Sequence, residues 1–192
     1  MLEQELLSRQ KAYFASGETL DINKRIISLL QLKQAVQSHE QDVLSALKMD
    51  FSKCPFDTYT TELLLVLNEI DSFVNHLEKW SKPKRTSAGI FNFPSHGRIY
   101  HQPFGVALII APWNYPFMLA MSPLVGAIAA GNCVTLKPSS QTSYTAEVIR
   151  MIVNEAFLPE QVQVVLGSHQ TGDTLLELPY DFIFFTGSPE VG

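Results

Sequence analysis

Apolar residues recur at helical spacing through the first part of the chain. A short amphipathic turn starts at Leu2 and is broken by Gly17, and longer helices are predicted over Ile22–Leu47 and Thr58–Trp80. Each run carries one apolar face, as helices do when they pack against a core. The pattern therefore predicts an N-terminal helical segment over residues 1–81, whose apolar stripes serve packing rather than chemistry.

A different pattern occupies residues 82–102, where prolines and glycines recur. Two short runs, Ile90–Phe93 and Arg98–His101, suit edge strands, so we interpret this segment as a linker arm. Such an arm can pair with another subunit. Its short basic run, which begins at Lys82, is interpreted as part of a solvated linker.

From Pro103 onward, apolar strands alternate regularly with helices. The predicted strands are Val106–Ile110, Cys133–Leu136, Val162–Leu166 and Phe182–Phe185, and the predicted helices are Pro116–Ala130, Ser143–Phe157 and Thr171–Leu178. Strands that are apolar throughout are typical of parallel sheets covered on both faces. The chain is therefore predicted to be an α/β protein, with N-terminal helices followed by a doubly wound parallel sheet of nucleotide-binding type.

Composition agrees with this class and excludes others. Of the 192 residues, 46% are hydrophobic and 17% are charged, which describes a globular chain that forms a core. A net charge of −5 gives no support for nucleic-acid binding. The two cysteines, Cys54 and Cys133, make neither a disulfide framework nor a metal site. No signal peptide or transmembrane segment is predicted, and a reduced cytoplasmic location fits best.

The first candidate for chemistry is Asn114, which lies directly after the predicted strand Val106–Ile110. Ligands of open parallel sheets bind beyond the carboxyl ends of the strands. An Asn there can direct its side-chain NH2 at an oxygen that gains charge during acyl transfer, a contact worth about 3 kcal/mol. The alternative is that Asn114 caps a helix beginning at Pro116. The spacing alone does not decide between the two.

Two further clusters follow later strands. Lys137 can donate to ribose hydroxyls or attract a phosphate, although a lone Lys at a strand end is also typical of a solvated surface group. The loop Gly187–Gly192 brackets a turn with glycines, so its backbone N–H groups can approach a phosphate. No G-x-G-x-x-G motif occurs. The spacing of Gly187 and Gly192 is also the front half of a P-loop, so a P-loop phosphotransferase stays an alternative.

Taken together, in this order and spacing, these clusters resemble the aldehyde dehydrogenase superfamily, and within it the class 3 branch that acts on fatty or aromatic aldehydes. The matching strings are Pro103–Val106, Ala111–Phe117, Gly126–Asn132, Leu136–Ser139, Phe185–Ser188 and Val191–Gly192. The resemblance covers the whole chain and corresponds to the N-terminal portion of such an enzyme.

This resemblance implies oxidation of an aldehyde to a carboxylic acid with NAD or NADP, by a protein that is a homodimer at full length. In that case Asn114 is the oxyanion donor and Tyr115 faces the substrate channel. Trp113 lines the nicotinamide end, and Lys137 contacts the adenosine ribose. The implied cofactor-binding set is Trp113, Lys137, Ser140, Gly187, Ser188, Val191 and Gly192.

The sequence departs from the family pattern in two places. Many members carry Glu where this chain has Ser140; a carboxylate there chelates the ribose diol and repels a 2′-phosphate, so we expect NADP to be tolerated. The nucleophilic Cys and general-base Glu of the family lie downstream of Gly192, and neither Cys54 nor Cys133 matches the nucleophile motif. We therefore expect an incomplete NAD(P)-binding domain over 103–192, with the catalytic domain absent, exposed apolar surface and no turnover by the chain alone. The alternative within this fold is a truncated, inactive nucleotide-binding fragment.

Overall fold

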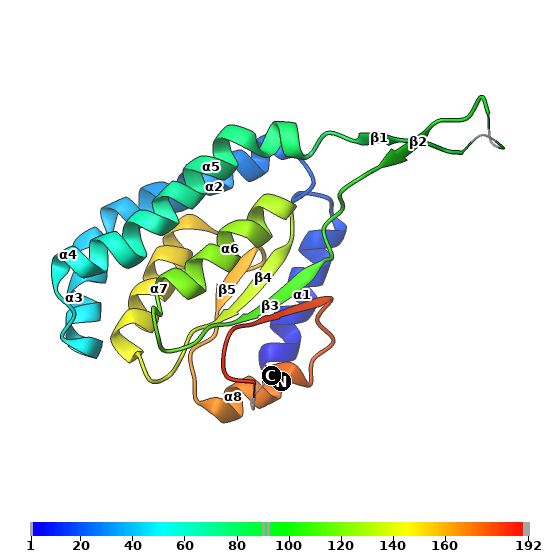
Figure 1. Ribbon diagram of the computed structural model, residues 1–192. Helices are drawn as coiled ribbons and strands as arrows, with labels where there is room; N and C mark the ends of the chain where they lie inside the picture. The colour runs from blue at the N-terminus through cyan, green and yellow to red at the C-terminus, as the bar shows by residue number, and fades with distance from the viewer. Residues whose placement is uncertain (1, 90, 92, 190–192) are drawn as a thin grey trace.

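The computed structural model describes residues 2–89, 91 and 93–189, and shows a central parallel sheet with helices on both faces (Figure 1). The sheet has the strand order β5–β4–β3–β6. Its strands are β3 (Val106–Ile110), β4 (Cys133–Lys137), β5 (Val162–Val164) and β6 (Phe182–Phe185). The chain runs outward from β3 through β4 to β5 and then returns to place β6 on the other side of β3. The predicted α/β architecture is confirmed.

The helices that connect the strands agree closely with the pattern in the sequence. They are α6 (Met118–Ala130), α7 (Ser143–Ala156) and α8 (His169–Leu176). Helix α6 begins two residues later than predicted, and it ends at Gly131, whose φ of 93° is the left-handed conformation that favours glycine. The predicted helix stop at that position is confirmed.

The N-terminal helices differ from the prediction in where they break. They are α1 (Leu2–Ala15), α2 (Ile22–Ser38), α3 (Glu40–Phe51), α4 (Pro55–Thr58), the π-helix η1 (Tyr59–Leu63) and α5 (Leu64–Trp80). The single helix predicted over Ile22–Leu47 is wrong, because the chain turns at His39. That residue ends α2 and begins α3 while its imidazole contacts the Asp42 and Glu155 carboxylates. Both helices bury an apolar face, so the hydrophobic pattern does not show the break.

The linker arm is a two-stranded hairpin that projects from the rest of the molecule (Figure 1). Strand β1 (Lys84–Thr86) pairs antiparallel with β2 (Gly97–Ile99). The predicted strand at Ile90–Phe93 is wrong for its described residues, since Phe91 and Phe93 lie in the connecting loop; Ile90 and Asn92 lie outside the described residues. The register of β1 with β2 places the described residues between Thr86 and Gly97 in that loop.

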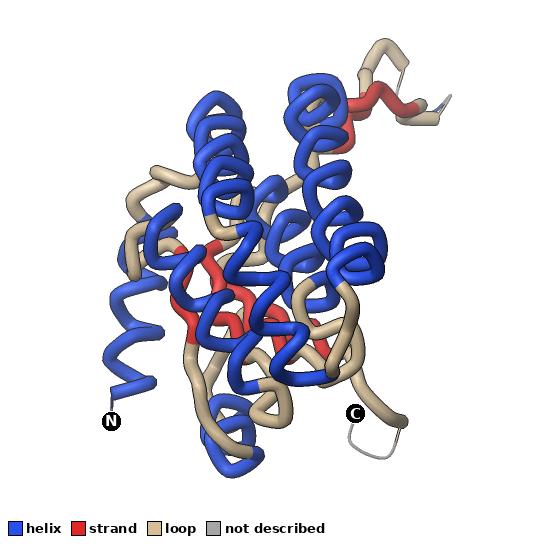
Figure 2. Tube along the Cα trace, turned by 90° about the vertical axis from the view of Figure 1, so that its left-hand side faces the viewer, coloured by secondary structure: helices blue, strands red, loops and turns tan. Residues whose placement is uncertain are grey.

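A large hydrophobic core joins the helical layer to the sheet. Buried side chains of α2, α3, α5, α6 and α7 pack with those of β3, β4 and β5 in one cluster. On the other face of the sheet, Leu7 of α1 packs with Val106 and Cys133 in a smaller cluster. Turned by 90°, the strands are seen to lie between helices (Figure 2).

Strand β6 forms one edge of the sheet, and among the described residues it pairs only with β3. Phe182, Ile183 and Phe184 remain exposed there. Phe182 stacks on Phe104 with ring centroids 4.7 Å apart. Together with α6, these phenylalanines line an apolar groove of 510 Å³. The exposed apolar surface expected from the sequence is therefore present.

Candidate functional site

The three candidate clusters meet at the carboxyl edge of the sheet. Ile110, at the end of β3, lies in register with Lys137 of β4 on one side and with Phe185 of β6 on the other. The strand order reverses between β3 and β6, and in open α/β sheets ligands bind beside such a reversal. The geometry therefore places the loops after β3, β4 and β6 at the edge where a doubly wound sheet forms its binding crevice.

The loop after β3 presents Asn114 to solvent. Trp113 and Tyr115, its neighbours, are exposed as well, whereas Phe117 is fully buried. Within the described part of the chain, the Asn114 side chain has no hydrogen-bond partner, and the residue at the N-cap of α6 is Phe117. The alternative in which Asn114 caps this helix is therefore wrong. Its NH2 group is free to donate to a ligand.

Two residues that the sequence reasoning missed hold this loop. The Glu62 carboxylate accepts hydrogen bonds from the backbone N–H groups of Phe117 and Met118, at 2.9 and 3.3 Å. It also accepts from Lys53 Nζ at 2.6 Å. A signal was present, because Glu62 is a charged residue directly before the apolar run Leu63–Leu67.

Lys137 is buried at the end of β4, with 6% of its surface exposed. The alternative of a solvated surface lysine is therefore wrong. Burial lowers the pKa of the Lys137 ammonium, and nearby Asp173 acts in the opposite direction. Among the described residues its Nζ donates only to the Pro138 carbonyl, at 3.5 Å. A buried ammonium with unused donors at this edge is suited to bind the hydroxyls of a nucleotide ribose.

Helix α8, which follows β5, has a glycine at position 172, and the missing side chain leaves room for Lys137. A Cβ atom at Gly172 would lie 3.3 Å from Lys137 Cε, which is tighter than ordinary van der Waals contact. Ser140, predicted to contact the cofactor, is exposed in the loop that follows β4. The structure thus places Lys137 between a strand end and the first part of α8.

The loop after β6 is described only as far as residue 189. Gly187 and Ser188 are exposed at the carboxyl edge, beside the loop that carries Asn114. A Cβ atom at Gly187 would lie 2.2 Å from Phe185 Cζ, so a larger residue would displace that ring. Val191 and Gly192, which were predicted to complete the pyrophosphate loop, lie outside the described residues.

Neither cysteine belongs to the loops after β3, β4 and β6. Cys133 is buried at the amino end of β4, the opposite edge of the sheet, where burial raises the pKa of its thiol to about 12. Cys54 is exposed at the start of α4, and its Sγ accepts a hydrogen bond from the Asp57 N–H. Over the described residues there is no group of three or more His, Cys, Asp or Glu side chains that could hold a metal ion. None of the described helices is long and apolar enough to cross a membrane.

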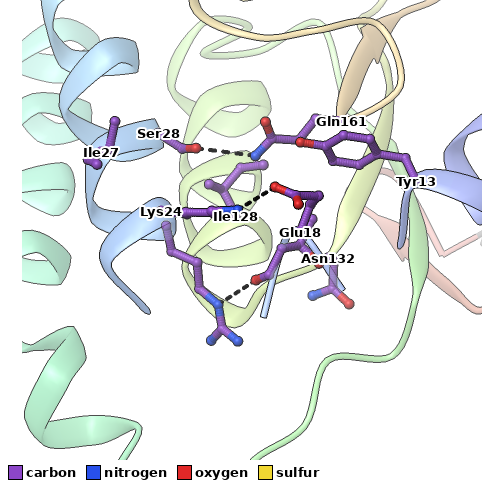
Figure 3. A pocket seen from close by; sticks show the side chains of 10 residues that line it. Tyr13, Glu18, Lys24, Ile27, Ser28, Ile128, Asn132 and Gln161 are labelled. Carbon is purple, nitrogen blue, oxygen red and sulfur yellow. Dashed lines mark hydrogen bonds and ion pairs between the residues drawn. The ribbon is translucent and has the colours of Figure 1, made fainter. Parts of the chain in front are cut away.

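A separate cavity of 190 Å³ lies between α2 and the C-terminal end of α6 (Figure 3). Its polar side chains largely bind one another, as Lys24 does with Glu18 and Gln161 with Ser28. Arg25 donates to backbone carbonyls, including that of Ala129 in the last turn of α6. Hydrogen bonds around this cavity therefore join α2 to α6, and Asn114 is not among the residues that line the cavity.

A parallel sheet whose strand-end loops surround a reversal in strand order defines the class of doubly wound nucleotide-binding domains. Comparison with known proteins then identifies the family. The aldehyde dehydrogenase family matches residues 4–192. The chain belongs to the aldehyde dehydrogenase family.

Individual relatives agree with this assignment. The chain is 40% identical over 192 residues to 4,4′-diaponeurosporen-aldehyde dehydrogenase of Staphylococcus aureus, covering 100% of the chain and 42% of the relative. It is 39% identical over 189 residues to aldehyde dehydrogenase family 3 member B3 of Mus musculus, covering 98% of the chain and 40% of the relative. The solved substrate-bound state of Staphylococcus aureus AldH superposes with a TM-score of 0.96 at 39% identity, covering 100% of this chain and 42% of that one. The chain thus spans about two fifths of the length of these relatives.

Proposed function

We propose that this chain forms the cofactor-binding and oxyanion-stabilising part of an enzyme that oxidises an aldehyde to a carboxylic acid with NAD or NADP. The observation that carries the proposal is the Asn114 side chain, which is exposed, unbonded within the described residues and located at the carboxyl edge of the sheet. Membership in the aldehyde dehydrogenase family supports it.

In the proposed reaction, a thiolate adds to the carbonyl carbon of the aldehyde, and the electron pair of the carbonyl π bond moves to the oxygen. Asn114 donates an N–H to that oxygen as its negative charge develops, which lowers the barrier because the donor is already in place. When the carbonyl re-forms, a hydride leaves the carbon and a thioester results, which water then hydrolyses to the acid. When bound, NAD or NADP supplies the hydride acceptor.

We assign the thiolate, and the carboxylate that activates the water, to residues downstream of Gly192, as the family resemblance implies. Four of the cofactor-binding roles fall to described residues: Trp113, Lys137, Gly187 and Ser188. Lys137 would donate to the ribose hydroxyls, and its spare N–H groups at the strand end support this role. The backbone at Gly187 and Ser188 would face the pyrophosphate, and Trp113 would line the nicotinamide end.

For the substrate, we propose a medium or long aliphatic, or an aromatic, aldehyde. Trp113, the residue before Asn114, lies near Phe51 with ring centroids 6.5 Å apart. Tyr115, the residue after Asn114, is exposed. Aromatic side chains on both sides of the donor favour an apolar substrate. Two relatives are named for apolar aldehydes, 4,4′-diaponeurosporen-aldehyde and 4,4′-diapolycopene-4,4′-dial.

We also propose that the whole protein is a homodimer to which the projecting hairpin contributes. Strands β1 and β2 pair with each other, and among the described residues neither pairs with the main sheet. The side chains of Ile99, the last residue of β2, and of Tyr100 after it are exposed, so a second subunit could bury them.

The test is Asn114→Ala in a polypeptide that spans the length of the relatives. We expect kcat to fall about 100- to 1,000-fold while the dissociation constant of the cofactor stays unchanged, since the donor acts on the reacting oxygen. Asn154→Ala, at an exposed position of α7, is the matched control and should leave both quantities unchanged. Equal losses in turnover and cofactor affinity would contradict the proposed role of Asn114.

A further inference from the structure

We propose that Glu62 and Lys53 are positioning residues that fix the loop 111–117 and, through it, the side chain of Asn114. The inference rests on the proposed function, in which Asn114 donates to the reacting oxygen. It identifies what holds that donor in place. Neither residue touches the reacting atoms in this scheme, so their effect on turnover must pass through the loop.

The carboxylate of Glu62 contacts two segments, the start of α6 and the side chain of Lys53. Its Oε2 accepts from the N–H groups of Phe117 and Met118, at 2.9 and 3.3 Å, and its Oε1 accepts from Lys53 Nζ at 2.6 Å. The side chain of Glu62 is 0% exposed. The N–H groups at the start of a helix have no partner within the helix, and a negative charge there is favourable. Glu62 therefore anchors the point at which the Asn114 loop becomes α6.

Lys53 reaches the other part of the loop. Its Nζ lies 4.7 Å from the centroid of the Tyr115 ring, so one ammonium contacts both Glu62 and the residue next to Asn114. Tyr115 has a φ of 49°, a left-handed conformation that bulky residues rarely adopt. Such a conformation persists only where its surroundings hold it. The Lys53 contact lies at this bend, and the Glu62 anchor follows it at Phe117 and Met118.

The local structure of the helix explains how Glu62 reaches the loop. Glu62 lies in η1, where a π turn interrupts the helix that continues as α5. Glu62 and Leu63 are both fully buried, although they are consecutive in sequence. The wider turn lets Glu62 face α6 while Leu63 stays in the hydrophobic core. π turns of this kind occur frequently at functional sites.

A role in stability alone explains these contacts less well. The free-energy cost of removing two charges from water offsets most of their attraction, so a buried ion pair is weak evidence for stabilisation. Proteins in which apolar residues replace such a pair are often as stable. What an apolar pair could not do is accept from two backbone N–H groups in a defined direction. The arrangement therefore favours positioning of the loop.

The first experiment compares Glu62→Gln with Asp71→Asn in the 192-residue chain by ¹⁵N NMR. Asp71 also binds a lysine, Lys33, at 2.6 Å, but this pair joins α2 to α5 and does not contact the loop. In Glu62→Gln we expect amide exchange at Phe117 and Met118 to be roughly tenfold faster, because their hydrogen bonds to a charged acceptor become weaker bonds to a neutral amide oxygen. We also expect the side-chain NH2 resonances of Asn114 to move.

Asp71→Asn should leave these signals unchanged. Unchanged Asn114 resonances in Glu62→Gln, or the same changes in both variants, would overturn the proposal. If far-UV circular dichroism shows that Glu62→Gln does not fold, Glu62→Asp takes its place. That variant keeps the negative charge beside Lys53 and withdraws the carboxylate from the N–H groups of Phe117 and Met118. Amide exchange at these two residues and the Asn114 side-chain resonances then test the proposal in the same way.

The second experiment uses the longer polypeptide and a double-mutant cycle. Glu62→Gln should lower kcat roughly tenfold when Asn114 is present and have no further effect in Asn114→Ala, because the pair acts through that side chain. Additive losses would overturn the positioning role. If Asn114→Ala itself leaves kcat unchanged, the proposed function fails instead, and the NMR comparison still decides whether Glu62 holds the loop.

Discussion

Gln10 of α1 and Thr135 of β4 lie 125 residues apart in sequence and share a buried hydrogen bond of 2.7 Å, donated by the Thr135 hydroxyl. Gln10 Nε2 donates in turn to the Val134 carbonyl at 2.8 Å. Both side chains are fully buried. This pair attaches α1 to β4, the strand that ends at Lys137, so the N-terminal helix supports the sheet that positions the crevice.

Thr135→Val should lower the free energy of unfolding by about 1–3 kcal/mol, because the Gln10 oxygen would stay buried without a donor. Chemical denaturation of the purified chain measures this. Thr174→Val is the control, since the Thr174 hydroxyl donates to the Gln170 carbonyl on the exposed surface of α8. Its effect should stay within about 0.5 kcal/mol. Equal effects of the two substitutions would show that the buried bond contributes nothing.

The junction between α2 and α3 should make stability depend on pH. Hydrogen bonds to Asp42 and Glu155 raise the pKa of His39, with that to Asp42 the larger cause. A histidine whose pKa is raised by folding stabilises the fold fully below its unfolded pKa of about 6.5. This contribution is lost as the pH rises through the higher pKa of the folded state.

His39→Gln should therefore destabilise the chain more at about pH 5.5 than at about pH 8.5, as measured by urea unfolding at each pH. His76→Gln serves as the control, because among the described residues the His76 Nδ1 atom contacts the Ser72 carbonyl and no carboxylate. A loss of stability in His39→Gln that is the same at both pH values would refute the proposed charge interaction.

Ser140→Glu should shift cofactor preference toward NAD. The exposed Ser140 position follows the strand end that carries Lys137, and a carboxylate there would repel a 2′-phosphate. We expect the ratio of the NADP to the NAD dissociation constant to rise by about tenfold, which corresponds to roughly 1.4 kcal/mol. Gln141→Glu adds the same charge one residue later and should change the ratio less. An unchanged ratio of the two dissociation constants in Ser140→Glu would contradict this explanation.

The 192-residue chain by itself should produce no NADH from aldehydes and NAD. Of its two cysteines, Cys133 lies at the sheet edge opposite Asn114, and burial raises the pKa of its thiol to about 12, so the thiolate is scarce. Absorbance of NADH during incubation with an aldehyde panel is the measurement. Appreciable NADH formation that Cys133→Ser or Cys54→Ser abolishes would contradict this expectation.

Several parts of this fold could be predicted from sequence because the signal is local. Strands β3 and β6 begin and end where predicted, since each is an unbroken apolar run. Helix α6 ends at Gly131 for an equally local reason, the left-handed conformation that glycine accepts. The break at His39 was missed because the helices on its two sides bury faces that continue one periodic pattern.

The sequence by itself determined the order of helices and strands, the class of sheet and the three loops that carry candidate chemistry. These features are local, because hydrophobic periodicity and the positions of glycine and proline are properties of neighbouring residues. Only the tertiary structure decided that Lys137 is buried with spare donors, that Asn114 does not cap α6, and that Glu62 and Lys53 hold its loop. Those facts depend on contacts between distant segments, such as that between Glu62 and Phe117, which lie 55 positions apart in sequence. Burial and hydrogen bonding are set by what packs nearby in space, which hydrophobic spacing along the chain does not specify.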